Sequence, residues 1–173
     1  SSLTQLAKRY IIKDFFEGVK DIPSEVIHLV EIDPPYAIDL KKAKKTDGVA
    51  IGTADYNEVD SQSYQVFLAN TFKECYRVMT QNSWLLCGFT PEPWFEIVCR
   101  ELQIAGFQST RMCGIWTKGY GQSKRPEMHL ANSYEMFFYA WKGRPALNKA
   151  GRSNEFEFSP IAAQNKTHPT ERP

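Results

Sequence analysis

With 173 residues, the chain has the length of one domain and enough side chains to build a sizeable core. Its composition is 42% hydrophobic and 13% aromatic, which excludes a wholly disordered chain. The formal net charge of +1 excludes binding to nucleic acid through bulk charge, so any such binding must depend on local patches.

The four cysteines contain no C-x-x-C pair, and three of them lie in apolar or amphipathic segments. This arrangement is typical of buried free thiols and predicts structural cysteines without a metal site. No apolar run after the first basic residues suggests a signal peptide. No stretch approaches the ~20 apolar residues of a membrane helix, so we expect a soluble protein in a reducing compartment.

The first third of the chain predicts short elements and one long loop. Residues 9–13 predict a strand, and residues 14–20 predict a short helix that ends before Pro23. Residues 26–32 are β-branched or apolar almost throughout, which predicts a central strand of a parallel sheet, covered on both faces. Residues 37–63 are polar and have no convincing period. They predict a long loop, which is either functional or a solvated surface excursion.

The rest of the chain alternates between helix and strand patterns. The predicted elements are helices over 64–79 and 94–105 and strands over 82–89, 107–118 and 134–141. This order predicts one α/β domain with crossover helices. A polar loop over 119–133 joins the last two strands, which we expect to pair antiparallel at an edge of the sheet. Residues 144–173 predict a loop-rich C-terminal segment of the same domain.

The tetrapeptide Asp33-Pro34-Pro35-Tyr36 directly follows the strand predicted over 26–32, and open α/β sheets bind ligands at the carboxyl ends of their strands. An exocyclic amine of a nucleobase is a poor nucleophile, because its lone pair is delocalised into the ring. A carboxylate from Asp33 and a carbonyl from Pro34 can accept its two N–H groups and turn the lone pair toward an electrophile. The prolines stiffen the loop, and Tyr36 offers a face on which an extruded base can stack. The tetrapeptide is therefore either a catalytic loop of this kind or a rigid turn capped by an aspartate.

Several segments resemble, in order and spacing, the β-group of DNA amino-methyltransferases. These segments are residues 14–36, 74–79, 83–89, 105–107, 115–118 and 134–143. The closing Thr167-His-Pro-Thr-Glu-Arg-Pro173 is similar to the HPT-x-(K/R)-P element of this group. The resemblance implies a Rossmann-like, S-adenosylmethionine-dependent methyltransferase fold, of which this chain carries the catalytic half.

The resemblance also implies a site-specific DNA methyltransferase that acts on the N6 amine of adenine. In this group, Asp at the first position of the tetrapeptide goes more often with N6-adenine methylation than with N4-cytosine methylation, so cytosine is the alternative. By resemblance, the catalytic residues are Asp33, Pro34, Pro35 and Tyr36, and the cofactor contacts are Asp33, His168, Thr170 and Arg172. DNA is the implied partner, the implied location is a cytoplasm of bacterial or phage type, and a homodimer of the full-length protein is compatible with it.

The chain departs from the group in its glycine-rich loop. The F-x-G-x-G loop that cradles the methionine part of the cofactor follows the HPT element in this group, and the chain stops at Pro173, before it. The sequence Gly119-Tyr-Gly121 lies in a polar linker and is a poor substitute. We therefore expect the isolated 173 residues to bind cofactor poorly and to transfer few methyl groups. A catalytically incomplete, nucleic-acid-binding fragment is the alternative from another functional class.

Basic side chains gather in the later loops. The candidates for DNA contacts are Lys118, Lys124, Arg125, Lys142 and Arg144. They either track phosphates, which position a protein without reading sequence, or they are ordinary solvated charges. No separate target-recognition domain is visible, so the sequence predicts no recognition sequence.

Overall fold

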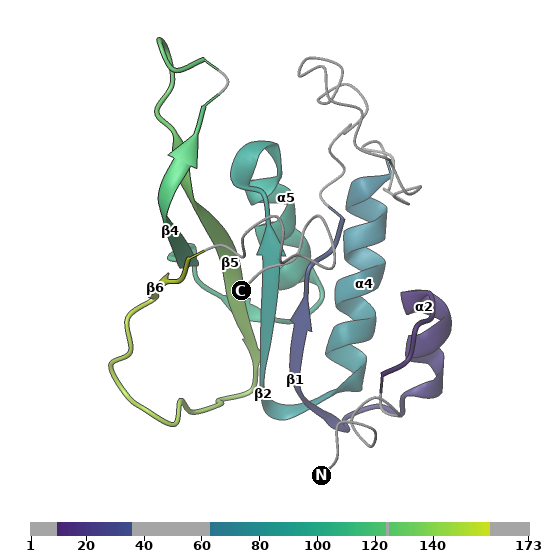
Figure 1. Ribbon diagram of the computed structural model, residues 1–173. Helices are drawn as coiled ribbons and strands as arrows, with labels where there is room; N and C mark the ends of the chain where they lie inside the picture. Colours follow the sequence, from purple (N-terminus) through teal and green to yellow (C-terminus); the bar gives the residue numbers. More distant parts are fainter. Residues whose placement is uncertain (1–9, 36–62, 124, 160–173) are drawn as a thin grey trace.

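A computed structural model describes residues 10–35, 63–123 and 125–159 (Figure 1). In chain order, its elements are α2 (Phe15–Gly18), the 3-10 helix η1 (Val19–Asp21), β1 (Ile27–Ile32), α4 (Tyr64–Val78), β2 (Met79–Phe89), α5 (Pro91–Ile104), β3 (Gln108–Ser109), β4 (Gly114–Gln122), β5 (Asn132–Lys142) and β6 (Glu155–Glu157).

One mixed sheet organises these elements, in the order β1-β2-β5-β4-β6, with β3 added to β5. β1 and β2 are parallel, and α4 is the crossover helix between them. β5 is antiparallel to both β2 and β4, whereas β4 and β6 are parallel. The predicted α/β fold with an antiparallel pair after α5 is therefore confirmed.

The core lies between α4 and α5 and one face of the sheet. Alternate residues of β2, Leu85 and Cys87, and their partners in β5, Ala140 and Phe138, are buried in one cluster with side chains of both helices. Successive side chains of a strand point to opposite faces, so Trp84, Tyr139 and Trp141 lie on the other face of the sheet. Their rings pack against one another and remain half-buried.

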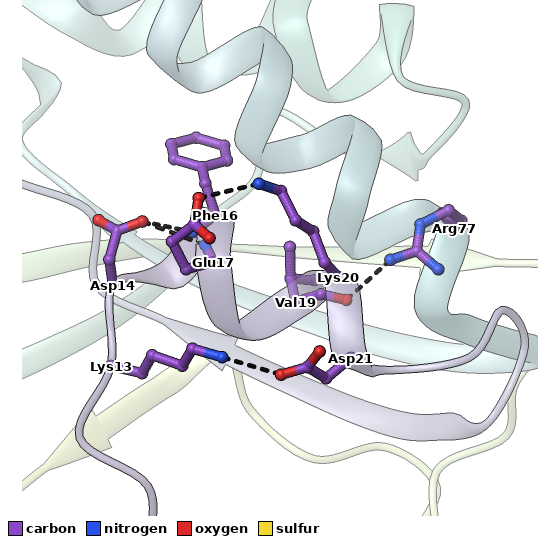
Figure 2. A network of polar contacts seen from close by, with 8 residues as sticks. All are labelled: Lys13, Asp14, Phe16, Glu17, Val19, Lys20, Asp21 and Arg77. Atoms are coloured by element: carbon purple, nitrogen blue, oxygen red, sulfur yellow. Dashed lines mark hydrogen bonds and ion pairs between the residues drawn. The ribbon is translucent and has the colours of Figure 1, made fainter.

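The segment that leads into β1 is fixed to α4 by one arginine. Asp14 caps α2 by accepting the N–H groups of Phe16 (2.9 Å) and Glu17 (3.2 Å). Arg77, in the last turn of α4, donates to the carbonyls of Val19 and Ile22, both at 2.9 Å. Figure 2 shows the guanidinium reaching across to Val19. These bonds satisfy carbonyls at the end of η1 and hold the chain where β1 must begin.

Two expectations for the N-terminal third are wrong. Residues 10–13 form no strand, and the side chains of Tyr10, Ile11 and Ile12 are at least 78% exposed. Within the described part of the chain, β1 pairs with β2 alone. It is an end strand there, and Leu29 and Glu31 are exposed on one face, so it is not covered on both faces.

The predicted loop over 119–133 is shorter than expected. β4 continues to Gln122 and β5 begins at Asn132, so the connection is 123–131. The loop predicted over 37–63 lies outside the described residues, apart from Ser63. The C-terminal segment from 144 contains the short strand β6 and no other helix or strand as far as residue 159.

All four cysteines are buried free thiols, as the sequence predicts. Burial raises the pKa of Cys75 from about 9 to about 12 and that of Cys113 to about 11. The folded state therefore favours the protonated thiols, and the stability they contribute is present below pH 9 and lost as pH rises above it. We expect a thiol-specific reagent at pH 8 to label these cysteines much more slowly in the native protein than in denaturant. Native labelling as fast as in denaturant would contradict this placement.

No helix in the described ranges combines the length and apolar character needed to span a bilayer.

Candidate active site at the carboxyl edge of the sheet

The parallel strands β1 and β2 end at the same edge of the sheet, because Ile32 pairs with Cys87 and β2 continues only to Phe89. Helix α4 begins at this edge, since it runs back to the start of β2, and α5 begins just after Phe89 (Figure 1). Asp33 directly follows β1 here. This is the edge at which open α/β sheets bind ligands.

The loop after β1 exposes its carboxylate and buries its first proline. Asp33 is exposed, Pro34 is buried and Pro35 is partly buried. The buried ring of Pro34 anchors the backbone, and its fixed φ limits the positions that Asp33 can take. The loop therefore presents an acidic side chain to a ligand from a stiff support.

Aromatic side chains form an apolar support beneath this edge. Tyr64, at the start of α4, is fully buried, and its ring lies 4.7 Å from that of Trp94 in the first turn of α5. Phe89 stacks on Phe138 with centroids 4.6 Å apart. The indole N–H of Trp94 is buried and finds no acceptor among the described residues. The sequence places these residues only in helix and strand patterns, because nothing in their spacing marks the edge.

The other predicted contacts at this edge lie outside the described residues. Tyr36, the base-stacking candidate, is one of them, and so are the cofactor candidates His168, Thr170 and Arg172. Lys124 is also outside. Asp33 is thus the one predicted cofactor contact that the structure describes, and the roles of the others stay predictions.

The four described basic candidates fall into two groups at opposite edges. β4 runs parallel to β2, so Lys118 and Arg125 lie toward the carboxyl edge, where Asp33 is. β5 runs the other way and ends at Lys142, so Lys142 and Arg144 lie at the opposite edge. The structure therefore brings only the first group to the side of the candidate site.

Lys142 is a structural lysine, which corrects its prediction as a DNA contact. Its side chain is buried, and its ammonium donates to the carbonyls of Tyr76 (3.1 Å) and Met79 (2.8 Å). The same group lies 4.5 Å from the centre of the Tyr76 ring and 3.5 Å from the Glu25 carboxylate. These contacts commit the ammonium to joining the end of α4 to the sheet, and a phosphate cannot reach it.

We expect Lys142→Met to lower the free energy of unfolding by about 1–3 kcal/mol, because two carbonyls lose a charged donor. Arg144→Met is the matched control, since Arg144 is exposed and its loss should change stability by less than about 0.5 kcal/mol. Denaturant unfolding followed by tryptophan fluorescence measures both values. Equal effects of the two substitutions would contradict the structural role of Lys142.

Solved structures share this arrangement of strands and helices. The M1.HpyAVI–SAM complex matches 94% of this chain and 70% of its own, with a TM-score of 0.60 and 15% identity. The cytosine-N4-specific PvuII DNA methyltransferase matches over 94% and 64%, with a TM-score of 0.64 and 14% identity. TTHA0409, a DNA modification methylase of Thermus thermophilus by its description, matches over 81% and 56%, with a TM-score of 0.51 and 15% identity. The fold is that of S-adenosylmethionine-dependent methyltransferases.

A family model described as DNA methylase, of the N6/N4 type, matches residues 27–173. The chain therefore belongs to this family of DNA amino-methyltransferases, as its tetrapeptide and ordered segments predict. It spans roughly 56 to 70% of the three solved chains described above. None of the curated proteins compared with the chain matches it.

Proposed function

We propose that this chain carries the base-binding side of the active site of a DNA methyltransferase that modifies the N6 amine of adenine, with S-adenosylmethionine as donor. The observation that carries the proposal is the exposed Asp33 at the carboxyl edge, held by the buried Pro34 directly after β1. The proposal includes a reducing cytoplasm as the compartment, which the four buried free thiols support.

The tetrapeptide acts on the amine through two acceptors. The Asp33 carboxylate accepts one N–H of the extruded base, and the Pro34 carbonyl accepts the other. Both bonds draw electron density back onto the nitrogen, so its lone pair points out of the ring plane as the new bond forms. Pro35 has no N–H that competes for these acceptors. Tyr36 stacks on the base, which adds about 1–3 kcal/mol to its capture.

S-Adenosylmethionine supplies an electrophilic methyl group when it is bound. It is a cationic ligand, and an exposed carboxylate at the end of β1 suits a ligand of that charge. Asp33 would hold its donor side together with His168, Thr170 and Arg172. The M1.HpyAVI complex, whose fold this chain shares, contains the same cofactor.

Methylation of the N4 amine of cytosine is the second candidate. The cytosine-N4-specific PvuII enzyme matches with a TM-score of 0.64, against 0.60 for M1.HpyAVI. The two acceptors of the tetrapeptide serve either exocyclic amine, because both are planar and carry two N–H groups. The aspartate at position 33 favours adenine, since the resemblance associates serine with cytosine at that position.

Mass analysis of nucleosides tests the proposal. DNA is incubated with the full-length protein and isotopically labelled S-adenosylmethionine, and its nucleosides are then separated. Labelled N6-methyladenine is the expected product. Labelled N4-methylcytosine alone would replace the adenine proposal by the second candidate. Binding of DNA that is indifferent to S-adenosylmethionine, with no labelled nucleoside, would contradict both.

A further inference from the structure

The hairpin of β4 and β5 projects beyond the edge at which Asp33 lies. Phe89, the last residue of β2, pairs with Met136, and β5 extends a further four residues from there back to Asn132. Asn132 is still paired with Gln122 of β4. At ~3.3 Å per residue, the arms rise about 13 Å past the end of β2. Figure 1 shows this hairpin standing above the arrowhead of β2.

Polar contacts fix the arms and the tip of the hairpin. Lys118 in β4 pairs with Glu135 in β5 and lies 5.2 Å from the centre of the Trp116 ring. At the tip, the carbonyl of Arg125 accepts the N–H groups of Met128 (3.0 Å) and His129 (2.8 Å). The tip is therefore a defined turn on braced arms, and its side chains have defined positions relative to the edge.

The tip displays aliphatic side chains beside basic ones. Leu130 is 94% exposed and Met128 is 66% exposed. Arg125 and His129, both exposed, belong to the same turn. A single exposed aliphatic residue is ordinary, but two at a projecting tip, next to cationic groups and the candidate site, are the features of a wedge that enters a base stack.

We propose that the hairpin tip, through Leu130 and Met128, inserts into duplex DNA and occupies the space that an extruded base leaves. The proposal rests on the proposed function, because it takes a DNA duplex as the partner. Extrusion of a base removes stacking from its neighbours, and aliphatic side chains that enter the gap restore contact there. Arg125 lies where it can approach the phosphates flanking the gap, which positions the tip without reading sequence.

An abasic duplex tests the wedge, because its stack already contains the gap. The probes are an intact duplex and the same duplex with one abasic site, and the measurement is the ratio of their dissociation constants by fluorescence anisotropy. The protein is expected to bind the abasic duplex about tenfold more tightly, since the cost of unstacking has been removed. Leu130→Ala and Met128→Ala are expected to bring the ratio close to one.

Two exposed residues at the opposite edge provide matched controls. Leu147 is 57% exposed after β5, and Met112 is 70% exposed before β4. Leu147→Ala and Met112→Ala are expected to keep the wild-type ratio, and thermal unfolding of all four variants checks that they fold. A wild-type ratio of one, or a ratio unchanged in Leu130→Ala and Met128→Ala, overturns the wedge while the proposed function stands. Binding to neither duplex at low salt overturns both.

Discussion

Asp33→Asn is expected to reduce methyl transfer by the full-length protein about 10²- to 10³-fold, the usual cost of losing one charge-stabilising group at a reacting centre. Asparagine keeps the shape of the side chain and one oxygen acceptor but removes the negative charge that draws on the amine. Asp33 is exposed and Pro34 buried, so the substitution should leave the anchoring of the loop intact. Steady-state transfer of labelled methyl groups to DNA measures the effect.

Glu31→Gln is the matched control for this loss. Glu31 lies two residues earlier in β1, is also exposed, and belongs to the same strand as the loop it precedes. Its neutralisation removes an identical charge without touching the proposed acceptors, and turnover should remain within about twofold of wild type. If both variants lose activity equally, the general field of this edge matters and the specific acceptor role of Asp33 is wrong.

The position of the candidate loop can be predicted from sequence because local signals agree there. β-Branched residues form β1, and Pro34 and Pro35 end it, so the chain must leave the sheet at Asp33. The alternation of helix and strand then places this end beside that of β2. The roles of Tyr36, His168, Thr170 and Arg172 remain predictions, since they lie outside the described residues.

Features that depend on contacts between distant residues cannot be predicted in this way. No local pattern indicates that Lys142 is buried, because its acceptors belong to Tyr76 and Met79, more than 60 residues earlier. The far part of β4 carries no strand signal, because its residues Gly119 to Gln122 are polar or glycine and pair mainly through the backbone. Met128 and Leu130 do leave a signal, namely aliphatic residues inside a polar connection.

Phe138→Ala is expected to lower the free energy of unfolding by about 3–5 kcal/mol, the cost of removing a fully buried phenylalanine. Phe138 has no exposed surface, and its ring lies 4.6 Å from that of Phe89 and 5.3 Å from that of Phe95. A cavity there would separate the end of β2 from the start of α5, directly beneath the edge that carries Asp33. Chemical denaturation followed by tryptophan fluorescence gives the difference.

Phe158→Ala provides the control for this prediction. Phe158 is 58% exposed, and its hydrogen bonds to Thr117 and Trp116 involve only its backbone N–H and carbonyl. Its substitution should therefore change stability by less than about 1 kcal/mol. Since whole domains are stable by only about 5–15 kcal/mol, the Phe138 variant should also lose order at the catalytic edge before it unfolds completely. A loss at Phe138 no larger than that at Phe158 would show that the ring stack does not support the edge.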